Sequence, residues 1–425
     1  MEIALVKTYL VGGAVRDMLM GIHYENDIST QDRDYVVVGA TPHQLIAEGY
    51  SQVASDFPVF LHPETGEEYA LARRERKTGS GYLGFESEYG TDVTLEQDLL
   101  RRDLTINSIA YDINGYGGFI DPYNGEQDIL DKTLRHTSEA FCEDPVRVLR
   151  VARFRARFGS DWVIAQETKE LIHGMAKKGT LSELQPERIW KELSRALMEP
   201  HPRLFFDTLL ECDALHAIFP EIYRLKTALE ARRWHPEGDA YEHTMLVLEQ
   251  AQQFDSNLDV RYACLVHDIG KGITPRAELP KHYAHDVRGV ALVKQFSYRL
   301  CVPTKLRDRA AKATRYHMLL HKLNTLNAKT FVKMFDEMSA LNDPYAVTLL
   351  YCVGVCDERG RLGSENNTWT HLSELTESFH AYQSVRFVDV FPEGEHNANK
   401  IKQGLYKARI AAVEEARRAR QSSNT

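Results

Sequence analysis

The sequence predicts an α+β protein in which a head built on a mixed β-sheet is followed by a long, entirely helical region. Short runs of β-branched and aromatic residues alternate with helical segments through the first ~140 residues. From Pro145 onward, apolar residues recur at spacings of three to four, and no further strand pattern is convincing. A chain of 425 residues is too long for one ordinary core, so two to four domains are expected.

The elements of the head follow from local patterns. Period-two runs predict strands, and Asp-Pro-Tyr-Asn-Gly predicts a turn after a last short strand. The expected strands are Thr8–Val11, Tyr35–Val38, Val59–Leu61 and Glu68–Ala72, with the turn-ending strand at Phe119–Gly125. Further on, prolines punctuate the helices at Pro186, Pro200, Pro202 and Pro220, and Ala231–Tyr241 is typical of a linker into another helical unit.

Composition narrows the class of protein. The hydrophobic content of 43% is ordinary for a globular protein, and no run of about 18 apolar residues predicts a membrane span. The first residues lack the apolar core of a signal peptide. The six cysteines are scattered without a CxxC pair, which argues against a zinc knuckle and fits a reducing cytoplasm.

Charge is unevenly distributed along the chain. The net charge of −9 alone would discourage a prediction of nucleic-acid binding. Residues 144–203, however, hold 12 Lys and Arg against 8 Asp and Glu, and residues 400–420 hold 7 against 2. Local basic surfaces are therefore expected on an acidic protein, although solvated helix faces are the simpler interpretation of such runs.

Two motifs near the N-terminus predict metal-dependent phosphoryl or nucleotidyl transfer. Asp32 and Asp34 precede an apolar run, and residues i and i+2 of a strand point to one face, where two carboxylates can share hard cations such as Mg²⁺. Gly12-Gly13 opens a helix, whose N-terminal N–H groups can face a phosphate. Each motif alone is weak, and the pair together is more specific.

A second pattern predicts recognition of a base. Asp144-Pro145 is a good helix start, which is the simpler interpretation of that Asp. Arginines then follow along one broad helix side at Arg147, Arg150, Arg153 and Arg157. An acceptor at Asp144 beside the donor fork of Arg147 can complement the Watson–Crick edge of cytosine or adenine, which pairs an amino donor with a ring-nitrogen acceptor.

These motifs together resemble the bacterial class II tRNA nucleotidyltransferases, the CCA-adding enzymes, in their long multifunctional form with a C-terminal HD phosphohydrolase domain. The resemblance covers about residues 7–365 and rests on six motifs in family order. They are Gly12–Asp17, Asp32–Asp34, Arg101–Asn107, Asp121–Gly125, Glu143–Arg147 and Glu187–Glu192. One departure is the stretch 22–31, which is longer than the family pattern and includes Asp27, an acid set apart from the strand that follows Asp32 and Asp34.

The resemblance implies a polymerase-β-like head that adds CCA to the 3′ end of tRNA from CTP and ATP, with release of pyrophosphate. Asp32 and Asp34 would be catalytic and would hold Mg²⁺. Nucleotide binding would involve Gly13, Arg16, Arg102, Asp144, Arg147, Arg150 and Arg153. The third carboxylate that such sites often use is not assigned by the sequence.

A histidine-rich segment predicts a second metal site. His267-Asp268 near a helix end, with His243 before it and Asp357 after it, offers mixed imidazole and carboxylate ligands that suit a transition metal. This segment resembles the HD phosphohydrolases. The resemblance implies 2′,3′-cyclic phosphodiesterase, 2′-nucleotidase and phosphatase activities, a divalent transition metal with Ni²⁺ as a candidate, and helper roles for Lys271 and His285.

The expected domains are a nucleotidyltransferase head at 1–140, a helical neck and body at 141–228, an HD domain at 229–365 and a helical tail at 366–425. The expected protein is cytoplasmic, binds tRNA, CTP and ATP, and is a monomer or homodimer. Two alternatives stay open: a bacterial poly(A) polymerase, whose head motifs are similar, and an HD phosphohydrolase with an inactive RNA-binding head.

Overall fold

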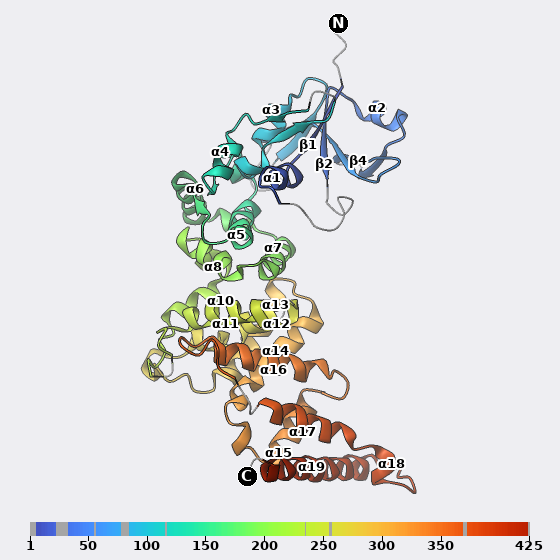
Figure 1. Cartoon of the computed structure of the whole chain (residues 1–425), viewed down its shortest axis with the longest axis vertical. Coiled ribbons are helices and arrows are strands. Elements are labelled where there is room, and N and C mark those ends of the chain that lie inside the picture. The colour runs from blue at the N-terminus through green and yellow to red at the C-terminus, as the bar shows by residue number, and fades with distance from the viewer. Residues whose placement is uncertain are drawn as a thin grey trace. The chain divides into compact units, whose positions relative to one another are not determined.

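The computed structural model describes residues 6–22, 33–54, 57–77, 85–114, 117–233, 235–254, 257–368 and 372–423. Asp32, Asp27 and most of the stretch 22–31 lie outside these residues. The chain divides into two compact units, residues 1–192 with 204–218, and residues 193–203 with 219–425. Figure 1 shows the strands in the N-terminal part of the chain and helices throughout the rest, which confirms the predicted α+β fold class.

The first unit is built on a mixed seven-stranded sheet with the strand order β3-β4-β5-β2-β1-β8-β9. Only β2 and β5 run parallel, and the other neighbours are antiparallel. The strands are β1 Lys7–Val11, β2 Asp34–Val38, β3 Ser51–Ala54, β4 Phe57–Leu61, β5 Glu68–Leu71, β8 Ala110–Asp112 and β9 Phe119–Ile120. The predicted strands are therefore present with small shifts at their ends.

Both faces of this sheet are covered, because alternate residues of its central strands enter different cores. Leu10 of β1 packs in one cluster with Val15 of α1 (Gly13–Leu19). Its neighbours Tyr9 and Val11 pack in another cluster with Leu99 of α3 (Leu95–Leu100). The sheet is thereby a buried layer, and functional side chains emerge at its strand ends.

The first unit contains further helices, most of which follow the sheet in sequence. They are α2 Pro42–Ala47, α4 Gly125–Leu130, α5 Val146–Phe158, α6 Gln166–Lys177, α7 Pro186–Met198, α8 Pro202–Glu211 and α9 Leu215–Ile218, with α7 and α8 each crossing the division between the units. One two-residue strand, β11 Val163–Ile164, pairs in parallel with β10 Thr133–Leu134. The expectation of no strand after Pro145 is wrong at this point, because a two-residue strand is too short to leave a period in the sequence.

The second unit is helical in its described residues. It contains α10 Pro220–Tyr223, α11 Ala240–Phe254, α12 Leu258–Val266, α13 His285–Arg299, α14 Thr304–Leu320, α15 Ala328–Glu337, α16 Tyr345–Arg359, α17 Ser373–Ser384, α18 Phe387–Val390 and α19 Ala398–Ser423. One hydrophobic core is formed by residues of α14, α15, α16 and α17 together with Val413 of α19. Cys352 and Cys356 of α16 are buried.

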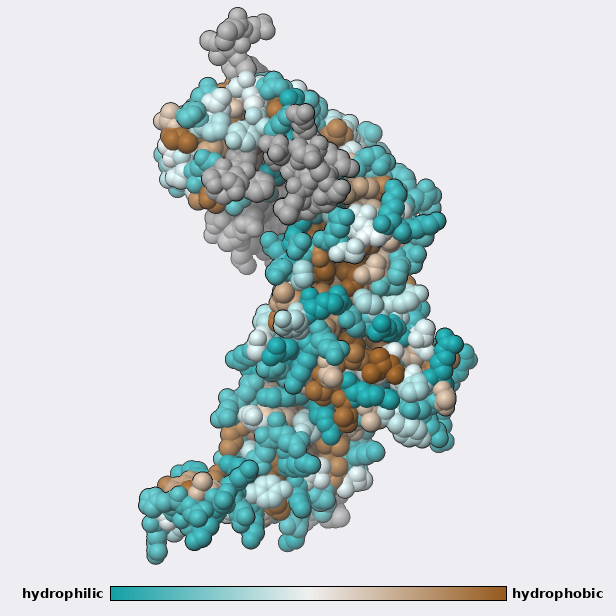
Figure 2. Space-filling view, turned by 180° about the vertical axis from the view of Figure 1, so that it is seen from behind, coloured by the Kyte–Doolittle hydropathy of each residue, from teal (hydrophilic) through white to brown (hydrophobic). Residues whose placement is uncertain are grey.

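The face drawn in Figure 2 is largely hydrophilic, and its hydrophobic residues are interspersed with polar ones. Among the described residues, none of the helices combines the length and the apolar character that crossing a membrane requires.

Candidate functional site

The turn between β1 and α1 brings a carboxylate and a guanidinium to one point. Val11 pairs with Asp34 in the β1–β2 ladder, so the turn that follows Val11 lies beside Asp34. Gly12 has φ 73° and ψ −134°, a conformation that essentially only glycine adopts. A Cβ at Gly12 would lie 3.3 Å from Arg102 Nη1 and 3.8 Å from Asp34 Oδ2. The absence of a side chain here lets the backbone of the turn approach an acid and a guanidinium closely.

A second acid stands next to Asp34. In the parallel β2–β5 ladder Asp34 and Glu68 are direct partners, so their side chains share a face, and both residues are exposed. Two carboxylates on neighbouring strands are a suitable ligand set for a hard cation. No role was predicted for Glu68, because only the strand pairing brings it beside Asp34.

Arg16 lies beneath this turn and is 3% exposed. Its Nη1 donates to Asn107 Oδ1 at 2.7 Å, its Nη2 donates to Asp17 Oδ1 at 2.6 Å, and its guanidinium lies over the ring of Phe154. Burial lowers the pKa of Arg16, and Asp17 opposes that effect. A Cβ at Gly13 would lie 3.5 Å from Arg16 Nη2. In this structure Arg16 therefore connects α1 to the 3₁₀ helix Thr105–Asn107 and to α5.

Arg102 retains an unused hydrogen-bond donor. Asp98 is buried and accepts from Arg101 Nη2 at 3.1 Å and from Arg102 Nη2 at 3.2 Å. Burial raises the pKa of Asp98, but the two guanidinium groups outweigh burial and the pKa lies below its ordinary value. Arg102 Nε is buried without a hydrogen-bond partner. A buried donor without a partner is costly, and an acceptor oxygen that reached this nitrogen would be stabilised by it.

Asp144 and Arg147, the pair predicted to read a base, are each held by hydrogen bonds to neighbouring groups. Asp144 Oδ1 and Oδ2 accept from Arg188 Nη1 and Nη2 at 2.9 and 2.6 Å, and Asp144 Oδ1 also accepts the backbone N–H of Val146. Arg147 donates to the carbonyl oxygens of Ala140 at 2.7 Å and Arg101 at 2.5 Å. Asp144 thus also accepts a backbone N–H at the start of α5, the kind of contact that its simpler interpretation predicts. Arg188 lies in a motif that carried the resemblance, but no role was predicted for it.

The remaining arginines of α5 are each paired with an acid. Arg150 Nε donates to Asp103 Oδ2 at 2.6 Å, and Arg153 Nε donates to Glu192 Oε2 at 2.7 Å. Arg153 and Glu192 are both buried, at 8% and 4% exposure. These contacts order α5 against its neighbours, and the nucleotide-binding roles expected of Arg150 and Arg153 stay predictions.

In the second unit, the four predicted metal ligands converge. His243 comes from α11, His267 and Asp268 follow α12, and Asp357 comes from α16; all four are buried. His243 Nε2 lies 3.1 Å from Asp357 Oδ1 and 3.8 Å from Asp268 Oδ2, and His267 Nε2 lies 3.3 Å from Asp268 Oδ2. Segments more than 100 residues apart thus meet at one point.

The tautomers of three histidines are set by the backbone. The Nδ1 atoms of His267, His285 and His317 lie 2.7, 2.8 and 2.8 Å from the carbonyl oxygens of the residues three positions earlier, so each must carry the proton. Their Nε2 atoms face Asp268. His267 Nε2 and Asp268 Oδ1 are buried. Imidazoles oriented in this way around carboxylates fit a divalent transition metal.

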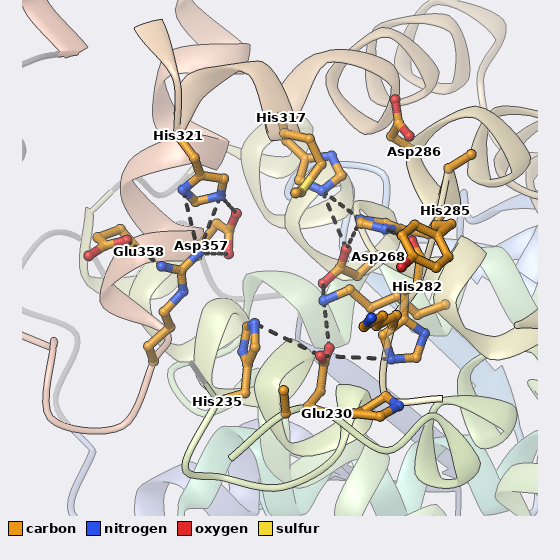
Figure 3. A pocket seen from close by; sticks show the side chains of 18 of the residues that line it. Glu230, His235, Asp268, His282, His285, Asp286, His317, His321, Asp357 and Glu358 are labelled. Atoms are coloured by element: carbon orange, nitrogen blue, oxygen red, sulfur yellow. Dashed lines mark hydrogen bonds and ion pairs between the residues drawn. The ribbon is translucent and has the colours of Figure 1, made fainter. Parts of the chain in front are cut away.

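Asp268 belongs to two groups of residues whose ligand atoms lie close enough together to hold a metal ion. One contains His243, His267 and Asp268, and the other contains Asp268, His285 and His317, whose Nε2 atoms lie 3.2 and 3.4 Å from Asp268 Oδ1. Figure 3 shows His285 and His317 pointing toward Asp268 from neighbouring helices. A helper role was predicted for His285 and no role for His317. The spacing of these two residues from His267 does not predict that their side chains meet at Asp268.

Lys271 lies directly against this cluster. Its Nζ is 2.6 Å from Glu230 Oε1 and 2.7 Å from Asp268 Oδ2. Burial lowers the pKa of Lys271, but the two carboxylates outweigh burial and the pKa lies above its ordinary value, so the side chain stays cationic. The cluster opens into a pocket of about 900 Å³ lined also by His321, Asp357 and Arg361. This lining suits a phosphate ester next to a metal.

Comparison with known families places the site at Asp34 and the histidine cluster in two different domains. Residues 8–135 match the poly A polymerase head domain. Residues 163–225 match the probable RNA- and SrmB-binding site of polymerase A, and residues 240–341 match the HD domain. The chain carries a polymerase head domain and an HD domain. The head-domain match contains Asp34, Glu68 and Arg102, and the HD-domain match contains His243, His267 and Asp268.

Solved structures extend the likeness over nearly the whole chain. A CCA-adding enzyme in apo form II has a TM-score of 0.66 at 18% identity, covering 99% of this chain and 92% of that one. The Bacillus stearothermophilus CCA-adding enzyme in complex with CTP has 0.62 at 19%, covering 98% and 95%. The Thermotoga maritima CCA-adding enzyme complexed with tRNA_CCA has 0.61 at 17%, covering 99% and 92%. The resemblance to CCA-adding enzymes with an HD domain is confirmed in fold and domain order.

Proposed function

We propose that this chain adds CCA to the 3′ end of tRNA, using CTP and ATP and releasing pyrophosphate. The observation that carries the proposal is the convergence of Asp34 and Arg102 on the backbone of the glycine turn at Gly12. Solved proteins of the same fold are described in complexes with CTP, with ATP and with tRNA_CCA. An exposed acid pair beside a glycine turn and an arginine with a spare donor suit a nucleoside triphosphate.

In this proposal each head residue has a distinct task. Asp34 and Asp32, with Glu68 as the third carboxylate, would hold Mg²⁺, which supplies charge stabilisation to the attacking and leaving oxygens. Arg102 donates from Nε to the nucleotide, where it finds the partner it lacks. Arg188 and the carbonyl oxygens of Ala140 and Arg101 hold Asp144 and Arg147 in fixed orientations, which favours reading of C or A.

The test is extension of tRNA that lacks its 3′ CCA, with Mg²⁺, CTP and ATP, read at single-nucleotide resolution. We expect three added residues ending in A, and loss of extension in Asp34→Ala. Long adenylate tails without C would instead identify a poly(A) polymerase. No extension at all would leave the head as an RNA-binding module and contradict the proposal.

For the HD domain we propose a metal-dependent phosphohydrolase that acts on 2′,3′-cyclic and terminal phosphates. The donor set around Asp268 would hold a divalent transition metal, with Ni²⁺ as a candidate, and the metal would supply a Lewis acid and an activated water. Lys271 and Arg361 contribute fixed positive charge toward the phosphate. Removal of such a phosphate regenerates the hydroxyl that CCA addition needs.

The phosphohydrolase proposal has its own test. Asp268→Ala should lose hydrolysis of 2′,3′-cyclic AMP while it still extends a tRNA with free hydroxyls. The same variant should fail to extend tRNA ending in a cyclic phosphate. Extension of that blocked tRNA by Asp268→Ala would contradict the coupling of the two activities. The proposed setting is the cytoplasm, with a monomer or homodimer and the domain division at residues 140, 228 and 365.

A further inference from the structure

A second pocket, of about 850 Å³, lies between α13 and α14. Its cationic lining residues are Lys294 of α13 and Arg307, Lys312 and Arg315 of α14. We refer to this pocket as the α13–α14 groove. Among the described residues, neither Lys294 nor Lys312 lies in an ion pair with a carboxylate, whereas Arg307 pairs with Asp308 at 2.9 Å. Two positive charges are therefore available to a partner.

The groove also presents an aromatic ring to solvent. Tyr298 follows Lys294 by one helical turn on α13 and lines the same pocket. It is 82% exposed, the highest value among the exposed large hydrophobic side chains of the described residues. An exposed ring next to unpaired lysines combines the two features that bind single-stranded nucleic acid, a base-stacking platform and backbone cations.

The groove adjoins the HD pocket. Arg315 lines the groove and pairs with Asp286, and Asp286 in turn lines the HD pocket together with Asp268 and His285. Figure 3 shows Asp286 at the edge of the HD pocket, with its carboxylate turned away from Asp268. His317, whose Nε2 lies 3.4 Å from Asp268 Oδ1, is two residues from Arg315 on α14. The same two helices thus form the groove and supply histidines to the metal cluster.

We propose that the α13–α14 groove binds the strand of an RNA whose 3′-terminal phosphate lies in the HD pocket. Lys294 and Lys312 contact backbone phosphates, and Tyr298 stacks on a base. This inference rests on the phosphohydrolase function proposed above and specifies its substrate as the end of a polynucleotide rather than a free nucleotide. In this proposal the strand passes the Asp286–Arg315 ion pair, which joins one residue of the HD pocket to one residue of the groove.

The test compares two substrates on the full-length protein. One is an RNA oligonucleotide ending in a 2′,3′-cyclic phosphate, and the other is 2′,3′-cyclic AMP, which is too small to reach the groove. In Lys294→Glu/Lys312→Glu we expect KM for the oligonucleotide to rise about tenfold or more, with KM for cyclic AMP unchanged. Tyr298→Ala should raise KM for the oligonucleotide about fivefold or more. Fluorescence anisotropy of the labelled oligonucleotide measures the same loss as weaker binding.

Lys402→Glu/Lys407→Glu is the matched control, because it changes the charge equally at two exposed lysines of α19. It should leave both substrates and the binding unchanged. Two results would overturn the groove proposal alone. One is an equal rise of KM for the oligonucleotide and for cyclic AMP in the groove variants, and the other is RNA binding by these variants as tight as that of the wild-type protein. A dimer, seen by sedimentation, that only the groove variants lose would overturn it as well, because the groove would then be a protein interface. If the wild-type protein hydrolyses neither substrate, the phosphohydrolase proposal fails and the groove proposal fails with it.

Discussion

Asp103 carries a buried negative charge beside the head site. It accepts from Arg150 Nε at 2.6 Å, from Asn107 Nδ2 at 2.9 Å and from the backbone N–H of Leu104 at 2.9 Å. Burial raises the pKa of Asp103, but these contacts outweigh burial and the pKa lies well below its ordinary value. Because the unfolded chain binds this proton more tightly, the carboxylate stabilises the fold above about pH 4 and progressively less as the pH falls further.

We therefore expect Asp103→Asn to lose on the order of 3 kcal/mol of unfolding free energy at pH 7, since Arg150 loses the carboxylate to which it donates. The variant should also show a shallower fall of stability below about pH 4 than the wild-type protein. Urea unfolding at a series of pH values measures both effects. Parallel pH dependences of the two proteins would show that Asp103 is not the titrating group.

Gly12 is constrained by its neighbours as well as by its backbone. Gly12→Ala should destabilise the fold and abolish nucleotidyl transfer, because the new Cβ would lie 3.3 Å from Arg102 Nη1. Gly21→Ala is the control, since Gly21 also has positive φ, 64°, but no described residue lies within 4 Å of its Cβ position. Tm and CTP binding by both variants distinguish backbone strain from crowding of Arg102 and Asp34. If the two substitutions had the same effect on CTP binding, the turn at Gly12 would not be part of the nucleotide site.

At the residue level, a short motif predicts a site well only when its members are neighbours in sequence. His267 and Asp268 are adjacent, and Asp34 opens a strand, so their chemistry was readable directly. Glu68, Arg188 and His317 were missed because strand pairing and helix packing bring them into place. Arg147 shows another limit, since a pattern that predicts a donor does not reveal that two backbone carbonyls already accept from it.

At the scale of elements, α5 and α7 are joined by the buried pair Arg153–Glu192. Replacing one partner, as in Arg153→Met or Glu192→Leu, should cost about 3–5 kcal/mol, because the other charge stays buried without compensation. The double replacement should cost clearly less than the sum of the two single changes. Chemical denaturation of the four proteins gives the coupling energy, and additive losses would show that the pair is not coupled.

The residue pattern of each strand explains whether that strand could be predicted from the sequence. β1, β2, β4 and β5 carry apolar or aromatic residues and were found to within a few residues. The hairpin of β6 (Arg73–Lys77) and β7 (Phe85–Tyr89) was missed, because Arg-Arg-Glu-Arg-Lys has no apolar alternation and forms a two-stranded sheet of its own. Two strands of the large sheet, β3 and β8, were missed as well, because each is only three or four residues long and leaves too short a pattern in the sequence.

At the scale of the whole molecule, the two proposed activities should be restored by different metals after all metal has been removed. Chelation should abolish both, with Mg²⁺ restoring CCA addition and a transition metal restoring phosphate release. A metal that binds only the folded HD site at 100 times its Kd should add about 2.7 kcal/mol to the stability of the second unit. Calorimetry of the chelated and reloaded protein measures this shift. An unchanged Tm after reloading with Ni²⁺, Mn²⁺ or Co²⁺ would contradict a metal site at Asp268.

The carbonyl contacts of His267, His285 and His317 have a consequence for how an ion enters. These rings lose their rotational freedom as the chain folds, because each Nδ1–H is already bound to a backbone oxygen. An arriving ion therefore meets oriented donors, and little ordering entropy is lost at that moment. Ion capture should then be limited by how fast the ion sheds its water, and one metal should replace another without any opening of the helices.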